Sequence, residues 1–475
     1  MPANSRHPDH TANLPKVTRV RDALDGDRVR AAGETYLPKP SGMDRDDYRA
    51  YLKRPLYYGA TERTLQGISG LVFRRKTQAE IPLGKLASDL IANVDQRGSS
   101  HDRFAQTVFD EVFTSGRAGV YVSLPESFAP GARARQSIYR YEQIINWDEE
   151  NNPDGSPRLT RVVFFEQPLV VDPQDPYTKK RIDQYRDVHI DPATGVVRVD
   201  LRRKRKDVDS AAPGNNEEVI YATRYPVFRG TALTEIPFVC INARSLGMEI
   251  EKPPLLPLAD ANIYHWTQMA DRRHAEHNVA AATGLYITAD GIKATDVKFG
   301  PQAVLTVPKS DAKVGLIEYS GQGLTPLQEG IDATTGYMAT LGARLLEVQK
   351  ASAETAETHR LRQGREQATV AGTVQNINDG LSISTTTMLK LSGVDGEARI
   401  EANTDLVDAK LTPDEMRVWM EAVQTKAVTF DVYWKAMQKG EMVPNDITSE
   451  EAQKQLAVES EQSLPAPLPA HNQEF

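Results

Sequence analysis

The sequence has very little cysteine: Cys240 is the only one in 475 residues. A lone thiol cannot form an intramolecular disulfide, so the chain is not a disulfide-stapled secreted scaffold. Cys240 lies in the apolar run 236–241, which favours a buried structural thiol over a reactive one. A catalytic cysteine would need a partner base, and the sequence does not place one.

Long apolar runs are missing as well. No stretch approaches the roughly 18 consecutive apolar residues of a transmembrane helix, so we expect no membrane partner. The first 16 residues are polar and lack the apolar centre of a secretory signal. Hydrophobic residues make up 40% and charged residues 26%, which excludes disorder of the whole chain and indicates a folded protein.

Positive charge is not in excess, because the net charge is −8 and the isoelectric point about 5.7. This balance argues against a protein that grips DNA over a broad basic surface. It leaves open a protein that surrounds DNA loosely, since an acidic wall repels phosphate and leaves it mobile.

Nucleotide-binding and catalytic motifs are missing too. The sequence contains no G-x-x-x-x-G-K-[ST] motif that would cradle a triphosphate. The segment 321–323 (GQG) begins like a dinucleotide motif but continues Leu-Thr-Pro. We therefore predict that the chain is not an enzyme and uses no cofactor.

The best metal-like cluster is His274-Ala275-Glu276-His277, with His265 and Asp271 nearby. Zinc proteases place their two histidines four residues apart, whereas these lie three apart. A solvated or inter-subunit helix face is favoured, and a metal-dependent nucleic-acid hydrolase using His274 and His277 is the alternative. A second acidic group suggests two-metal carboxylates, but its prolines favour a loop; it comprises Asp172, Asp175 and Asp183, beside Pro173 and Pro176.

The N-terminal part has helical signals. We expect residues 1–35 to be a poorly ordered start followed by a surface-packed segment. Asp44 is a suitable N-cap for a helix through Lys53, and apolar spacing predicts a second helix over 57–71. A third helix is predicted over 100–115, with Gly116 at its C-terminal cap.

The middle of the chain has the period of strands. Short β-type runs alternate with turn signals rich in Asn, Asp, Pro and Gly. The runs are 120–122, 161–165, 185–190, 196–201, 219–223 and 238–241. We therefore predict an α+β fold with a mostly antiparallel β region after N-terminal helices.

The C-terminal half is helical again. A long helix is predicted over 256–282, strands over 285–288, 303–307 and 314–318, and a helix over 327–348. A polar break at 349–358 precedes a helical pattern over 370–391. Capping boxes start at Thr412 and Thr448, one apolar stripe runs over 416–437, and a Pro-rich tail over 464–475 is expected to be disordered. Spacing alone does not decide whether the long helix belongs to a globular bundle or packs against copies of itself in a ring.

A series of short segments resembles the tailed-phage portal family, in particular a group with an N-terminal signature GxxYLP, YxxYL and RTLxGxxGxVF. None of the segments is catalytic, and their order and spacing carry the resemblance. They are 33–38 (GETYLP), 48–54 (YRAYLKR), 63–74 (RTLQGISGLVFR), 115–122 (SGRAGVYV), 139–147 (YRYEQIINW), 236–239 (IPFV) and 254–263 (PLLPLADANI). Together they span roughly residues 20–345.

The resemblance implies a division of the chain into portal regions. These are an N-terminal arm (1–35), a wing (36–255), a first stem helix (256–283), a clip (284–322), a second stem helix (323–348), a tunnel loop (349–358), a wing helix and return (359–410), a crown-like helical region (411–462) and a tail (463–475). It also implies a ring of about twelve copies at one capsid vertex of a virion, assembled in the host cytoplasm. Double-stranded DNA, not read by sequence, would pass through, and the terminase, a head–tail adaptor and the major capsid protein would be partners. Besides the hydrolase, another virion protein that only mediates interactions is an alternative.

The resemblance also assigns site residues. The tunnel loop would face DNA through Gln349, Lys350, Ser352, Glu354, Thr355, Glu357 and Thr358. The clip would bind terminase or adaptor through Tyr286, Lys293, Asp296, Lys298, Lys309 and Lys313. The basic run Arg202, Arg203, Lys204, Arg205 and Lys206 is a solvated hairpin or a contact for phosphate or capsid.

Overall fold

The computed structural model describes residues 3–125, 133–172, 175–208, 216–280, 283–287, 313–317, 321–346, 356–404, 413–439, 442–443 and 447–462. The fold is α+β, as the sequence predicts. The chain divides into two compact units, one of residues 1–347 and 351–405 and one of residues 348–350 and 406–475. No helix within the described ranges combines the length and apolar character needed to span a bilayer.

The first unit begins with six helices. They are α1 (Pro8–Ala23), α2 (Gly26–Ala32), α3 (Arg45–Lys53), α4 (Ala60–Val72), α5 (Lys85–Ala92) and α6 (His101–Ser115). Local caps set several of their ends. Asp44 accepts a hydrogen bond from the Asp47 N–H at the start of α3, and Ser100 caps α6 in the same way. Gly116 ends α6 with a φ of 88°, the left-handed conformation expected at this cap.

The prediction for residues 1–35 was wrong, because α1 is a well-packed helix. Val17, Val20 and Ala23 are fully buried. Arg21 joins α1 to the body, since its guanidinium lies 2.6 Å from Glu111 and also pairs with Glu142. Buried apolar surface and a shielded ion pair thus anchor the segment.

Two antiparallel sheets form the β region, which confirms the prediction for the middle of the chain. The five-stranded sheet has the order β10-β9-β8-β5-β4, and the three-stranded sheet the order β13-β2-β3. Their strands are β2 (Arg117–Ser123), β3 (Arg135–Tyr139), β4 (Ile144–Asn151), β5 (Pro157–Glu166), β8 (Gln184–Ile190), β9 (Val197–Lys204), β10 (Glu218–Arg224) and β13 (Phe238–Asn242). Apolar side chains of both sheets share one core, in which Tyr121, Phe164 and Cys240 are buried. Burial raises the pKa of the Cys240 thiol to about 11, in keeping with the structural thiol that its apolar run predicts.

Three short two-stranded ladders complete the β structure of this part. They are β1 (Gln78–Glu80) with β16 (Arg399–Glu401), β6 (Leu169–Asp172) with β7 (Asp175–Arg181), and β11 (Val227–Phe228) with β12 (Thr231–Ala232). Asp172 and Asp175 therefore lie in a strand pair. The Asp175 carboxylate accepts hydrogen bonds from the Tyr177 N–H and the Thr178 hydroxyl.

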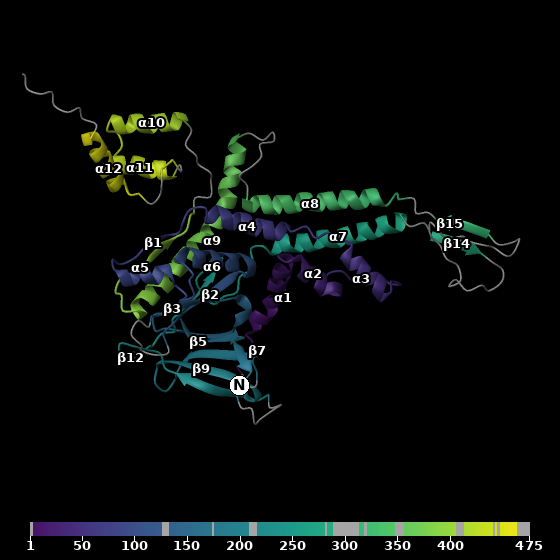
Figure 1. Cartoon of the computed structure of the whole chain (residues 1–475), viewed down its shortest axis with the longest axis horizontal. Coiled ribbons are helices and arrows are strands. Elements are labelled where there is room, and N and C mark those ends of the chain that lie inside the picture. The colour runs from purple at the N-terminus through teal and green to yellow at the C-terminus, as the bar shows by residue number, and fades with distance from the viewer. Residues whose placement is uncertain are drawn as a thin grey trace, which may run out of the picture. The chain divides into compact units, whose positions relative to one another are not determined.

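A helix–strand–strand–helix unit follows β13. It consists of α7 (Leu256–Ala280), β14 (Thr283–Ile287), β15 (Lys313–Ile317) and α8 (Leu324–Leu346). The 36-residue helix α9 (Ala356–Leu391) comes next and packs against β13 and β16 (Figure 1). At Gly380 the contact is so close that an added Cβ would lie 2.5 Å from Cγ1 of Ile241.

The second unit contains α10 (Pro413–Gln424), α11 (Phe430–Lys439) and α12 (Ser449–Gln462). The sequence predicts one stripe over 416–437, but the chain turns between α10 and α11, where Lys426 has a φ of 61°. The capping box at the start of α12 is confirmed, because Thr448 and Glu451 exchange side-chain to backbone hydrogen bonds. Trp434 binds the carbonyl of Ile447 through its indole N–H at 2.9 Å.

Candidate functional site

Helices α7 and α8 form an antiparallel pair (Figure 1). Leu258 and Ala261 of α7 share a core with Met338 of α8, and the Thr334 hydroxyl donates to Oε1 of Gln268 at 2.7 Å. Residue numbers thus fall along α8 as they rise along α7. With 25 and 23 residues, the helices are each about 35 Å long at 1.5 Å per residue. Strands β14 and β15 pair antiparallel where the chain passes from one helix to the other.

We call helices α1 to α6 and the two sheets the body of the first unit. The first half of α7 is embedded in this body. Leu258, Ala259, Asn262 and Trp266 are buried where α7 meets α1 and α4. Asn262 is a fully satisfied buried amide. Its Oδ1 accepts hydrogen bonds from the N–H and the hydroxyl of Thr61, and its Nδ2 donates to the carbonyl of Tyr58. Buried polar groups with all partners in place fix one geometry.

The residues weighed as metal ligands have other partners. Tyr51 of α3 donates its hydroxyl to Asp271, and Arg54 lies 3.2 Å from Nδ1 of His274. Glu276 pairs with Arg272 and Arg273, each at 2.8 Å. Within the described residues, no group of three His, Cys, Asp or Glu side chains could hold a metal ion. Asp271 and His274 thus connect α7 to Tyr51 and Arg54, whereas the ion pairs of Glu276 lie within α7 itself.

The outward faces of the helix pair differ from the buried ones. Tyr264 of α7 and Tyr337 of α8 are 58% and 55% exposed, which is unusual for large aromatic side chains on a helix. As far as Gly342, the other exposed positions of α8 carry small, proline or acidic side chains. They are Thr325, Pro326, Glu329, Asp332, Ala333, Gly336, Ala339 and Thr340.

Strands β14 and β15 lie within the predicted clip. Tyr286 of β14 pairs in register with Val314, and Lys313 of β15 pairs with Ile287. Lys293, Asp296, Lys298 and Lys309, like the predicted strand over 303–307, lie outside the described residues.

The predicted tunnel loop falls mostly outside the described residues, which exclude Gln349, Lys350, Ser352, Glu354 and Thr355. Its end differs from the prediction, because α9 begins at Ala356. Glu357 and Thr358 therefore belong to the first turn of α9. The pattern placed the helix start too late because this turn is polar and lacks an apolar stripe.

Arg202, Arg203 and Lys204 form the end of β9 in the five-stranded sheet, and Arg205 and Lys206 lie in the 3-10 turn that follows. Three of the five cations have a carboxylate nearby. Arg202 lies 3.6 Å from Asp187, Lys204 lies 3.8 Å from Asp183, and Arg205 lies 3.2 Å from Glu217. Arg203 differs, because its guanidinium binds the neutral Gln184 amide oxygen and lies over the Tyr221 ring at 4.1 Å. Three of the five cations thus lie near a carboxylate, and the contact of the run with phosphate or capsid stays a prediction.

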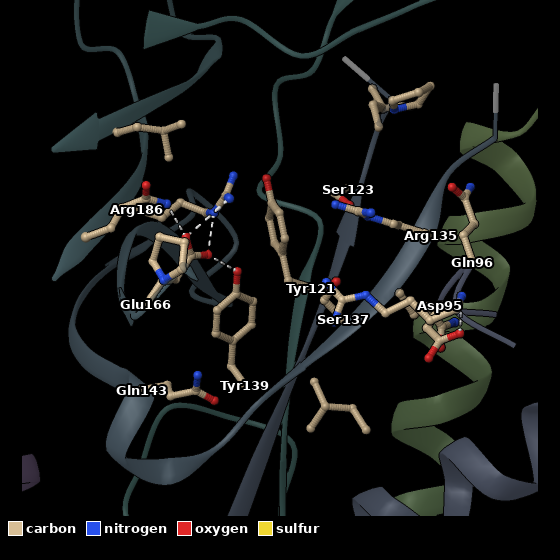
Figure 2. A pocket seen from close by; sticks show the side chains of 18 of the residues that line it. Asp95, Gln96, Tyr121, Ser123, Arg135, Ser137, Tyr139, Gln143, Glu166 and Arg186 are labelled. Carbon is tan, nitrogen blue, oxygen red and sulfur yellow. Dashed lines mark hydrogen bonds and ion pairs between the residues drawn. The ribbon is translucent and has the colours of Figure 1, made fainter. Parts of the chain in front are cut away.

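A polar cavity between the two sheets was not predicted from the sequence. Glu166 lies at its centre and accepts hydrogen bonds from Tyr139 at 2.6 Å, Gln184 at 2.5 Å and Arg186 at 2.8 Å (Figure 2). Burial alone would raise the pKa of Glu166, but the Arg186 charge and these hydrogen bonds hold it below its ordinary value. The cavity residues come from six strands, helix α6 and the loops between them, so no short motif could have revealed them.

Comparison with known proteins gives one family match and several similar structures. The family model described as "Domain of unknown function (DUF4055)" matches residues 254–390, which span α7 through α9. No curated protein matches the sequence.

Three solved structures come from gene transfer agent (GTA) particles, and each is 12% identical to this chain. A chain from the neck of the empty particle, computed with C6 symmetry, has a TM-score of 0.40 with 87% of this chain and 98% of that chain covered. One from the native virion has a TM-score of 0.35 with 84% and 94% covered. One from the native neck, computed with C12 symmetry, has a TM-score of 0.35 with 84% and 95% covered.

Proposed function

We propose that this chain is a portal subunit, a structural protein without an active site. Copies would form a ring of about twelve at one vertex of a phage capsid, through which double-stranded DNA is packaged and ejected. Terminase, a head–tail adaptor and the major capsid protein would dock on it. The observation that carries the proposal is the α7–β14–β15–α8 unit followed by the long helix α9.

The order of elements agrees with the regions that the sequence resemblance implies. N-terminal helices and two sheets precede the helix pair, as a wing precedes a stem. A strand pair lies between the two helices, as a clip does, and α9 follows a polar segment and packs back on the body. The body clamps α7 through Asn262 and Asp271, so the helix pair has a fixed attachment.

The chemistry of α8 suits a wall past which DNA slides. Its described exposed face carries Glu329 and Asp332 with small neutral residues, and no lysine or arginine. Such a face, turned toward a lumen, repels phosphate and forms no tight ion pairs that would hold the cargo. The net charge of −8 on the whole chain also repels phosphate.

The exposed tyrosines suit contacts between copies. Tyr264 and Tyr337 are large, rigid and amphipathic, which are the properties of side chains at the centre of protein interfaces. In a ring, the helix pair of one copy would lie beside that of the next. We therefore assign these two tyrosines to the inter-subunit contact.

Electron microscopy of the purified chain tests the proposal. We expect rings of about twelve-fold symmetry with a central hole. Tyr264→Glu and Tyr337→Glu should prevent ring formation, because each places a charge in a buried contact. Tyr177→Glu on β7 is the matched control, since this tyrosine is also exposed but lies outside the helix pair. Monomers in every salt and DNA condition would refute the proposal, and rings from both helix variants would refute the assigned contact.

A further inference from the structure

The cavity around Glu166 has a volume of about 940 Å³ and lies between the two sheets of the β region. Strand register explains its lining. On the three-stranded sheet, Tyr121 pairs with Ser137 and Ser123 pairs with Arg135, so all four face the same side. On the five-stranded sheet, Gln184 pairs with Arg203. Figure 2 shows Tyr121 standing between the Glu166 cluster and the side chains of Ser123 and Arg135.

The lining is strongly basic in an acidic protein. It contains six arginines and only two carboxylates, Asp95 and Glu166, and Arg133 also pairs with Asp89 outside the lining, which leaves an excess of three positive charges. The arginines are Arg97, Arg133, Arg135, Arg186, Arg203 and Arg224. The chain as a whole carries a net charge of −8, so the cavity is a positively charged region of an acidic protein and attracts anions.

Several of these groups retain unused binding capacity. Arg186 is neutralised by Glu166, but the cation of Arg203 is held by the neutral amide of Gln184 and the ring of Tyr221. Tyr121 is 4% exposed and lines the cavity, and among the described residues its hydroxyl makes no hydrogen bond, so it can donate one to a ligand.

We propose that this cavity binds a small multiply charged phosphate-type anion, such as a diphosphate group. Arginine guanidinium groups bind phosphate oxygens through paired N–H donors, and a diphosphate carries enough negative charge to match the excess. The Tyr121 hydroxyl and the Arg203 guanidinium are the inner ligands, while Arg135 and Arg97 contribute at the exposed rim.

The size of the cavity limits which phosphate-bearing molecules can enter it. A volume of 940 Å³ is typical of small-molecule sites and too small for a DNA duplex. A free diphosphate and one end of a single strand both present closely spaced phosphates. The proposal does not depend on ring formation, because every lining residue belongs to one chain.

Calorimetric titration of the purified full-length chain with pyrophosphate, at constant ionic strength, tests the site. Arg203→Gln should weaken binding roughly tenfold or more, and Tyr121→Phe by a few-fold. Arg198→Gln is the matched control, because Arg198 lies on the same strand β9 but pairs with Asp200 outside the cavity. Arg135→Gln, at an exposed position, should also weaken binding and serves if Arg203→Gln fails to fold.

Titration with a short oligothymidylate and with a DNA duplex separates the sources. A single strand that competes with pyrophosphate identifies nucleic-acid phosphates as the ligand, and failure to compete identifies a free anion. Both results support the site. Absence of pyrophosphate binding to the unmodified chain, or an equal loss in Arg198→Gln, overturns it. These outcomes are independent of whether the chain forms rings.

Discussion

Asn262 caps a helix that begins about two hundred residues earlier in the chain. Its Oδ1 accepts a hydrogen bond from the Thr61 N–H at 3.0 Å, in the first turn of α4. This N–H belongs to the group of donors that a helix cannot satisfy by itself. One amide on α7 thereby completes α4 and fixes the angle at which the α7–α8 pair leaves the body.

Replacing Asn262 with alanine is expected to lower the free energy of unfolding by about 1–3 kcal/mol, because it removes the acceptor of the buried Thr61 N–H and hydroxyl. Urea denaturation measures the change. Asn13→Ala is the control, since Asn13 is a half-exposed residue whose side chain bonds only within its own helix, donating to the Asp9 carbonyl and accepting from Lys16. It should change stability by less than about 0.5 kcal/mol. Equal effects of the two substitutions would contradict the capping role.

Two glycines of α9 should respond to alanine with opposite signs. Gly380→Ala places a Cβ against Ile241 of β13 and should cost about 1–3 kcal/mol through overpacking. Gly372→Ala meets nothing within 4 Å and should stabilise by up to about 1 kcal/mol, because alanine has the higher helix propensity. Thermal and urea unfolding of both variants report the signs. Stabilisation by both would mean that α9 does not pack on β13 as described.

Acid should weaken the fold through His10 and His101. Burial, aided at His10 by the Arg117 charge, lowers the pKa of each imidazole to about 4 from an ordinary value of 6.5. Between these values the unfolded chain binds a proton that the folded chain does not, so stability falls as pH drops from 6.5 toward 4. The loss is on the order of 1–3 kcal/mol per imidazole.

His10→Phe should flatten this dependence, because the ring still stacks on Tyr141 but cannot titrate. The measurement is the free energy of unfolding between pH 7 and pH 4. His277→Phe is the control, since His277 is exposed. An unchanged pH slope in His10→Phe would show that His10 is not among the groups that weaken the fold in acid.

The polar segment before α9 offers a test of the DNA-facing assignment. Deleting residues 351–355 should leave ring formation intact, because the packed contacts of α8 and α9 lie on either side. Packaging or retention of DNA should be impaired. A variant in which the same residues are replaced by glycine and serine keeps the length of the segment but removes its charged side chain. It therefore shows whether length or side chains matter. Failure of the deleted chain to form rings would place the segment in the assembly core instead.

Local signals predicted much of the fold. Asp44, Ser100 and Gly116 mark helix ends within a few residues of sequence, and alternation marks the central strands because one face of each sheet is buried. Helix α1 was missed because its buried face is short and includes the polar His10. The break between α10 and α11 was missed because the apolar stripe continues in register across the turn at Lys426.

The candidate sites depend on contacts that no local pattern contains. Asn262 and Thr61 are 201 positions apart, and Tyr139 meets Glu166 only because two sheets pack face to face. The basic run 202–206 suggested a phosphate contact from composition alone. In the structure three of its cations lie near carboxylates, and Arg203 lines the cavity.

The attachment of α7 to α3 reaches as far as His274, where Arg54 binds its ring. Beyond that residue α7 packs against α8, and because the two helices are antiparallel, residue numbers increase in opposite directions along them. An insertion on α7 therefore stays in phase only when α8 gains a matching length. Whole turns added to both helices would lengthen the α7–α8 pair without disturbing its attachment. The length of the pair can therefore evolve independently of the rest of the fold.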